Sequence, residues 1–90
     1  MGGTSLGAKY SRDIEMISSV DVIMCAMQIE TGRNNGHLLH DLLMIRTGAS
    51  MPACLAASAK AKRERLIDMY TARDVVVTSD GMRYLSERAR

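Results

Sequence analysis

The chain contains no tryptophan and no phenylalanine, and three tyrosines are its only aromatic residues. The core must therefore be aliphatic, with eight methionines as flexible filler. Two cysteines are too few for a disulfide scaffold, and a single proline argues against a proline-rich linker. The longest fully apolar run has four residues, 42–45, whereas a membrane span needs about 20. Residues 1–12 hold no apolar stretch of signal-peptide length, so we expect a cytoplasmic protein without a membrane partner.

The length of the chain and its missing motifs argue against an enzyme. Ninety residues, 47% of them apolar, suffice for one small core and not for a deep two-domain cleft. The sequence has no glycine-rich phosphate loop, no H-E-x-x-H motif and no paired acidic motif. We therefore expect a binding protein that uses no cofactor.

Charge is distributed unevenly along the chain. Residues 1–45 carry three basic and five acidic groups, whereas residues 46–90 carry nine basic and five acidic groups. The formal net charge of +2 is weak support for nucleic-acid binding, since strongly binding domains are usually more basic.

Glycine-rich residues 1–9 show no apolar periodicity and are expected to form a flexible tail before a single domain over 10–90. Apolar periodicity and capping residues define the elements of that domain. The predicted elements are helices over 11–30, 37–46, 51–70 and 80–90, with one strand over 75–77 before the last helix. The fold class is therefore mainly α, with three helices, one short strand and a C-terminal helix.

The first predicted helix carries two apolar strips. One strip suffices for the core of a monomer, and the second consists of Ile14, Val22, Cys25 and Ile29. Either this second strip forms the interface of a homodimer, or the helix is buried on two sides within one chain. If the strip forms a homodimer interface, Val22→Glu is expected to give a folded monomer.

The second and third predicted helices have the layout of a helix-turn-helix. Gly48 lies in the turn between them, Ser50 is a good N-cap, and Pro52 suits a first helical turn. In such a motif the second of the two helices enters the major groove of DNA. Lys62 is the exception in the third helix, because it falls within the arc of Met51 and Leu55 that the pattern places inward.

From this point the sequence resembles winged-helix DNA-binding domains of the MarR, PadR and IclR kind, over about residues 37–86. In those domains an apolar pair leads from the recognition helix into a strand that ends in V-x-L-T-x-x-G-x-x-x-L. Here the pair is Leu66-Ile67 and the ending is Val75-Val76-Val77-Thr78-x-x-Gly81-x-x-x-Leu85. The resemblance implies that Thr78 caps the last helix and that Gly81 lets it approach the sheet closely. The sequence departs from this pattern in one respect: only about four residues separate the third helix from the valine run, so a full two-stranded wing does not fit.

A basic cluster spans Lys60 to Arg65 near the end of the third helix, with Glu64 opposing phosphate within it. The residues expected to contact DNA are Lys60, Arg63, Arg65, Arg73, Arg83 and Arg46.

Cysteine and histidine offer two weaker hypotheses. His37 and His40 share a helix face, but with Cys25 and Cys54 they lack the spacing of a compact zinc site, so no metal is expected. Cys54 lies in the first turn of a helix, where a thiol can become reactive. A small buried apolar role for Cys54 is the simpler interpretation.

The sequence therefore predicts a small transcription regulator that binds duplex DNA as a homodimer. The alternative is a small protein-binding adaptor or inhibitor, of the kind found in phages and mobile elements, with a helical core and no DNA binding.

Overall fold

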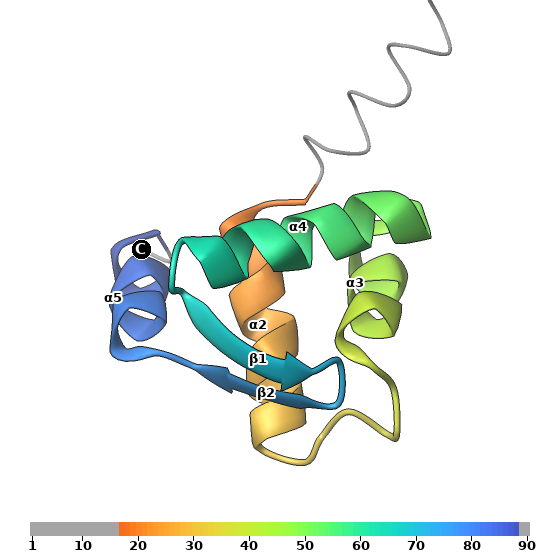
Figure 1. The fold of residues 1–90 in the computed structure, drawn as a ribbon, viewed down its shortest axis with the longest axis horizontal. Coiled ribbons are helices and arrows are strands. Elements are labelled where there is room, and N and C mark those ends of the chain that lie inside the picture. Colours follow the sequence, from red (N-terminus) through yellow and green to blue (C-terminus); the bar gives the residue numbers. More distant parts are fainter. Residues whose placement is uncertain (1–16, 89–90) are drawn as a thin grey trace, which may run out of the picture.

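The computed structural model describes residues 17–88, which form a mainly helical domain with one small sheet (Figure 1). Its elements are α2 (Ser19–Glu30), α3 (Leu39–Thr47), α4 (Met51–Arg63), β1 (Ile67–Thr71), β2 (Asp74–Val77) and α5 (Ser79–Arg88). The mainly α, winged-helix-like order predicted from the sequence is confirmed, with two strands in place of one. The predicted tail, residues 1–9, and Ile14 of the predicted dimer strip lie outside the described residues.

Helix α2 begins later than the sequence pattern predicts. The Ser18 hydroxyl accepts a hydrogen bond from the Asp21 N–H (3.2 Å), and the Asp21 carboxylate accepts one from the Ser18 N–H (3.1 Å). This reciprocal pair is a capping box, which stabilises a helix start at that point. The described helix therefore spans 19–30. The prediction of one continuous helix over 11–30 is wrong, because Ile17 and Ser18 are not helical, and residues 11–16 lie outside the described residues.

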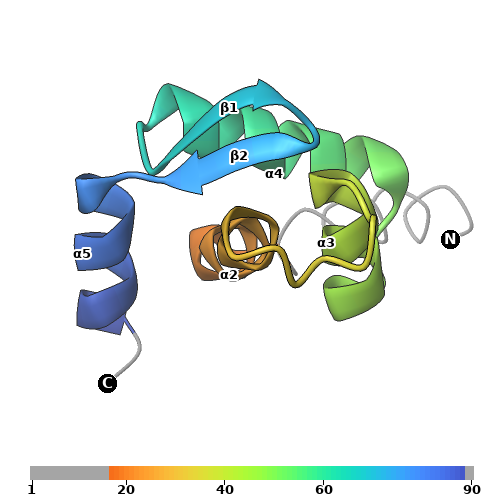
Figure 2. The same cartoon turned by 90° about the horizontal axis from the view of Figure 1, so that it is seen from below.

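Helix α2 is the centre of the domain and packs against α3, α4, α5 and β2. Figure 2 views it along its axis, with the hairpin above it, α3 on one side and α5 on the other. Val22 and Cys25 are only 1% and 2% exposed within the single chain. The prediction that these two side chains line a dimer interface is therefore wrong, and Ile29 is half-buried against the same core. Burial of the helix on two sides, the alternative interpretation, accounts for Val22 and Cys25 of one strip and Ile23 of the other.

The turn between α3 and α4 has the predicted form. Gly48 adopts a left-handed conformation (φ 72°), and its N–H donates to the Met44 carbonyl (2.8 Å). Ser50 then caps α4 by accepting from the Ala53 N–H (3.4 Å). Helix α3 itself begins at Leu39 and not at residue 37. No single described helix is long and apolar enough to span a membrane; α3 and α4 reach that length and composition only together, and a bend of 117° separates them.

Helix α4 ends at Arg63, seven residues before its predicted end. The Leu66 N–H donates to the Ala61 carbonyl, and the Arg65 N–H donates to the Lys62 carbonyl, both at 3.0 Å. This pair of bonds defines a Schellman motif, in which the residue at the position of Arg65 adopts a left-handed conformation. Arg65 does so with φ 61°, although glycine is the usual residue there.

The early end of α4 frees residues 67–71 to form a second strand. Strands β1 and β2 pair antiparallel, with Ile67 opposite Val77 and Met69 opposite Val75. The Leu66-Ile67 pair leads into β1 as the resemblance implies. The expectation that a two-stranded wing does not fit is wrong, because it rested on a helix extending to residue 70.

The junction of β2 and α5 confirms the two roles expected from the motif. The Thr78 hydroxyl accepts from the Gly81 N–H (2.9 Å) and therefore caps α5. Gly81 is buried so closely against β1 that a Cβ atom there would collide with the Leu66 carbonyl oxygen. The first turn of α5 is thus packed directly on the turn that ends α4.

Candidate nucleic-acid interface

The buried side of α4 consists of small side chains and differs from the predicted one. Its buried residues are Ala53, Cys54, Ser58 and Ala61. Met51 and Leu55, which the periodicity places inward, are 44% and 48% exposed. The prediction of the inward side was therefore wrong, and Lys62 lies on an exposed side of the helix.

We call the exposed side chains of this helix the α4 face. It consists of Met51, Pro52, Leu55, Ala56, Lys60, Lys62 and Arg63. In Figure 1, α4 runs along the upper edge of the molecule, with α2, α3 and the hairpin below it. The face is apolar along the first part of the helix and cationic along its last turn.

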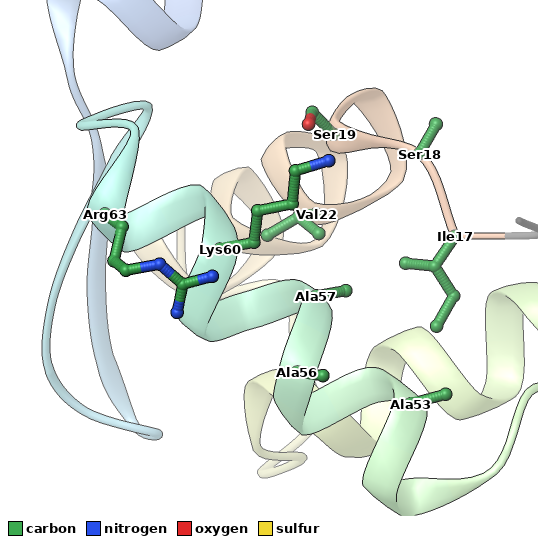
Figure 3. A pocket seen from close by; sticks show the side chains of 9 residues that line it. All are labelled: Ile17, Ser18, Ser19, Val22, Ala53, Ala56, Ala57, Lys60 and Arg63. Carbon is green, nitrogen blue, oxygen red and sulfur yellow. The ribbon is translucent and has the colours of Figure 1, made fainter. Parts of the chain in front are cut away.

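Lys60 and Arg63 border a pocket of about 220 Å³ between α4 and the start of α2 (Figure 3). Ser18 and Ser19 lie across the pocket from these two cations, and the remaining lining residues are small or aliphatic. No carboxylate lines this pocket among the described residues. Lys60 and Arg63 therefore present positive charge that is not opposed within the pocket.

Lys62 and Arg65 have a different electrostatic environment. Both line a recess between the end of α4 and the start of α5, together with Asp68 and Asp80. The two carboxylates oppose the two cations in this recess. Lys62 and Arg65 are therefore weaker candidates for phosphate contacts than Lys60 and Arg63.

The other three predicted DNA contacts lie away from this cluster. Arg46 donates from Nε to the Asp21 carboxylate (2.8 Å) and thereby ties α3 to α2. Burial of Asp21 raises the pKa of its carboxyl, but the hydrogen bonds from Arg46 and Ser18 outweigh burial and lower it overall. The pair engages Nε of Arg46 and leaves the side chain 44% exposed, so only its remaining N–H groups are free for the phosphate contact predicted from the sequence.

Arg73 and Arg83 belong to other elements than Lys60 and Arg63. Arg73 lies in the hairpin turn, which is held beside α3 because the Leu39 N–H donates to the Ala72 carbonyl (3.0 Å). The nearest carboxylate oxygen to Arg83 belongs to Asp80, at 4.0 Å. The structure thus groups three of the six predicted residues, Lys60, Arg63 and Arg65, at the end of α4.

Sequence reasoning missed an apolar surface beside the cations. Tyr70 on β1 is 74% exposed, and with Leu55 it lines a recess of about 170 Å³ between α4 and the hairpin. His40 lines the same recess, and its Nδ1 is buried without a hydrogen-bond partner among the described residues. The position of Lys62 within the apolar arc was the signal that this side of α4 faces outward.

The cysteines belong to the core. Cys25 and Cys54 are both buried, which confirms the small apolar role expected for Cys54. Burial raises the pKa of the Cys25 thiol to about 11. Within residues 17–88, no group of three or more histidine, cysteine or acidic side chains is placed to hold a metal ion.

Comparison of the chain with protein-family models, with curated proteins and with solved structures found no match.

Proposed function

We propose that this chain is a small cytoplasmic transcription regulator that binds duplex DNA with α4 in the major groove. One observation carries the proposal: an exposed helix, second in a helix-turn-helix arrangement, ends in cations that no carboxylate opposes in their own pocket. An α-helix is about 10–12 Å across with its side chains, and the major groove is about 12 Å wide. The small side chain of Ala56 on the α4 face allows close approach.

Phosphate contacts supply most of the affinity in this proposal. Lys60 and Arg63 release condensed counterions when they neutralise phosphates. Arg65 contributes less because Asp68 and Asp80 share its recess. Binding as a homodimer remains part of the proposal, with an interface other than the buried strip of α2, and sedimentation tests it.

The experiment is fluorescence anisotropy with a labelled duplex at several salt concentrations. Lys60→Ala and Arg63→Ala are each expected to lower the slope of log affinity against log salt by about 0.9. Arg33→Ala is the matched control, because Arg33 is an exposed arginine in the turn after α2 and its loss changes the net charge equally. Absence of duplex binding at low salt, or equal slopes for all three variants, contradicts the proposal.

A protein-binding function is the second candidate, because Met51, Leu55 and Tyr70 expose apolar surface beside α4. Interaction sites on proteins are often marked by such patches. The two candidate functions predict opposite effects of the same substitutions on binding. If the chain is an adaptor, a partner captured from nuclease-treated lysate is lost on Leu55→Asp and retained on Lys60→Ala, and no duplex binding is detected.

A further inference from the structure

The part of α4 that would meet the bases has no exposed polar side chain. Met51 and Leu55 are about half exposed, Pro52 and Ala56 are exposed beside them, and the first polar residue of the α4 face is Lys60. The two nearby serines are engaged within the chain. Ser50 accepts from the Ala53 N–H, and the buried Ser58 hydroxyl donates to the Cys54 carbonyl (2.9 Å).

This composition restricts how α4 can read a base sequence. Base edges in the major groove offer hydrogen-bond donors, hydrogen-bond acceptors and one apolar group, the C5-methyl of thymine. The first part of a recognition helix contacts these edges. Apolar side chains cannot pair with the donors or acceptors, so the methyl group is the only base-edge feature that Met51 and Leu55 complement.

We propose that the α4 face reads thymine methyl groups, so that the preferred ligand is duplex DNA rich in A·T pairs. This inference rests on the proposed function. The position of the cations on the same face favours DNA as the occupant. Lys60 and Arg63 follow Leu55 by five and eight residues, or about 7.5 and 12 Å along the helix axis. At 100° per residue they also lie roughly 140° and 80° around the helix from Leu55, so they face the phosphates that border the groove when Leu55 lies over the bases.

Deoxyuridine in place of thymidine tests the proposal directly, because it removes the methyl group and keeps the pairing edge and the phosphate. Burial of one methyl group contributes a factor of about four in affinity. We expect the A·T-rich duplex to lose about fourfold in affinity for each contacted thymine that is replaced. In a G·C duplex, 5-methylcytosine places a methyl group at the same position in the groove and is expected to raise the affinity by a similar factor.

Protein variants locate the methyl contact on α4. Leu55→Ala is expected to bring the ratio of thymidine to deoxyuridine affinity towards one while leaving the salt slope unchanged. Lys60→Ala is expected to weaken both duplexes equally. Met82→Ala is the matched control, because Met82 is exposed to a similar degree on α5 and its loss should leave the ratio unchanged. Circular dichroism melts verify that each variant is folded.

The outcomes distinguish failure of the methyl inference from failure of DNA binding itself. Salt-dependent binding with equal affinity for thymidine and deoxyuridine duplexes overturns the methyl inference and leaves DNA binding intact. A methyl preference that Leu55→Ala does not reduce overturns the assignment to α4. Failure to bind any duplex overturns the proposed function together with the inference.

Discussion

Replacing Gly81 with alanine tests the packing that holds the end of α4. Gly81 lies in the first turn of α5, and an added Cβ would collide with the Leu66 carbonyl oxygen and lie 2.8 Å from Cγ1 of Val77. The Leu66 carbonyl belongs to the backbone, so it cannot move away by a side-chain rotation. It also accepts a hydrogen bond from the Thr78 N–H (3.2 Å), which a shift would lengthen.

The magnitude follows from three opposing contributions to the free energy of unfolding. Overpacking typically costs about 1–3 kcal/mol, and loss of the Thr78 hydrogen bond costs about 1 kcal/mol. Alanine is favoured over glycine within a helix by about 1 kcal/mol. We therefore expect Gly81→Ala to destabilise the domain by about 2 kcal/mol, which for this size corresponds to a Tm lowered by roughly 8–16 °C.

Thermal melts followed by circular dichroism provide the measurement. Ser86→Ala is the control, because Ser86 is exposed on the same helix and its replacement only improves helix propensity, by a few tenths of a kcal/mol. Gly81→Val should melt lower still. If Gly81→Ala melts at or above the temperature of the unmodified protein, the close packing of α5 on the α4 turn is refuted.

Four further predictions address other parts of the fold. Asp21→Asn is expected to cost about 1 kcal/mol at neutral pH through the lost capping box. The folded state lowers the pKa of Asp21 below its ordinary 3.8, so the stabilisation that its carboxylate provides is lost as pH falls below about 4. In urea melts at acid pH, the free energy of unfolding of Asp21→Asn should therefore depend less on pH than that of the unmodified protein. Arg65→Gly relieves a left-handed conformation and should raise the Tm by roughly 4–8 °C. Cys25 and Cys54 should react with a thiol reagent only as fast as the protein unfolds, and fast reaction of the native protein would show that the core is open. Val22→Glu buries a charge in the core and should abolish the cooperative melt, contrary to the folded monomer expected for an interface residue.

Turn and capping residues predicted the fold better than apolar periodicity did. Four such residues have the roles predicted for them. Gly48 adopts the left-handed conformation of the turn, and Gly81 allows the close approach of α5. The hydroxyls of Ser50 and Thr78 accept the hydrogen bonds that cap α4 and α5. The end of α4 could not be predicted in the same way, because its left-handed residue is Arg65 where glycine is usual. The predicted third helix therefore extended to residue 70, whereas α4 ends at Arg63.

The missed strand had a pattern that was available in the sequence. Ile67 and Met69 face the core while Asp68 and Tyr70 are exposed, which is the alternation of a half-buried strand. An alternation over only four residues is too short to predict a strand when a helical pattern of apolar residues precedes it. The resemblance led only to the strand at 75–77, so β1 was missed by both lines of reasoning.

The candidate site was only partly predictable, because the size of the apolar side chains was misleading. Periodicity assigns the largest apolar residues of a helix to the core, which would bury Met51 and Leu55. The side of α4 that packs against the core carries small residues such as Ala53 and Ala61 instead. Small side chains allow α4 to pack closely, and the larger ones are then left on the exposed face.

The motif that suggested the fold also holds the cations of the candidate site in place. The Thr78 hydroxyl donates to the Arg65 carbonyl (2.6 Å), and the Thr78 N–H donates to the Leu66 carbonyl (3.2 Å). One residue at the start of α5 therefore fixes the turn in which α4 ends, while Gly81 allows the close approach that these bonds require. The last turn of α4 carries Lys60 and Arg63, so their position depends on a junction almost twenty residues further along the chain. Loss of that junction should weaken any function of the α4 face even though none of its own residues changes.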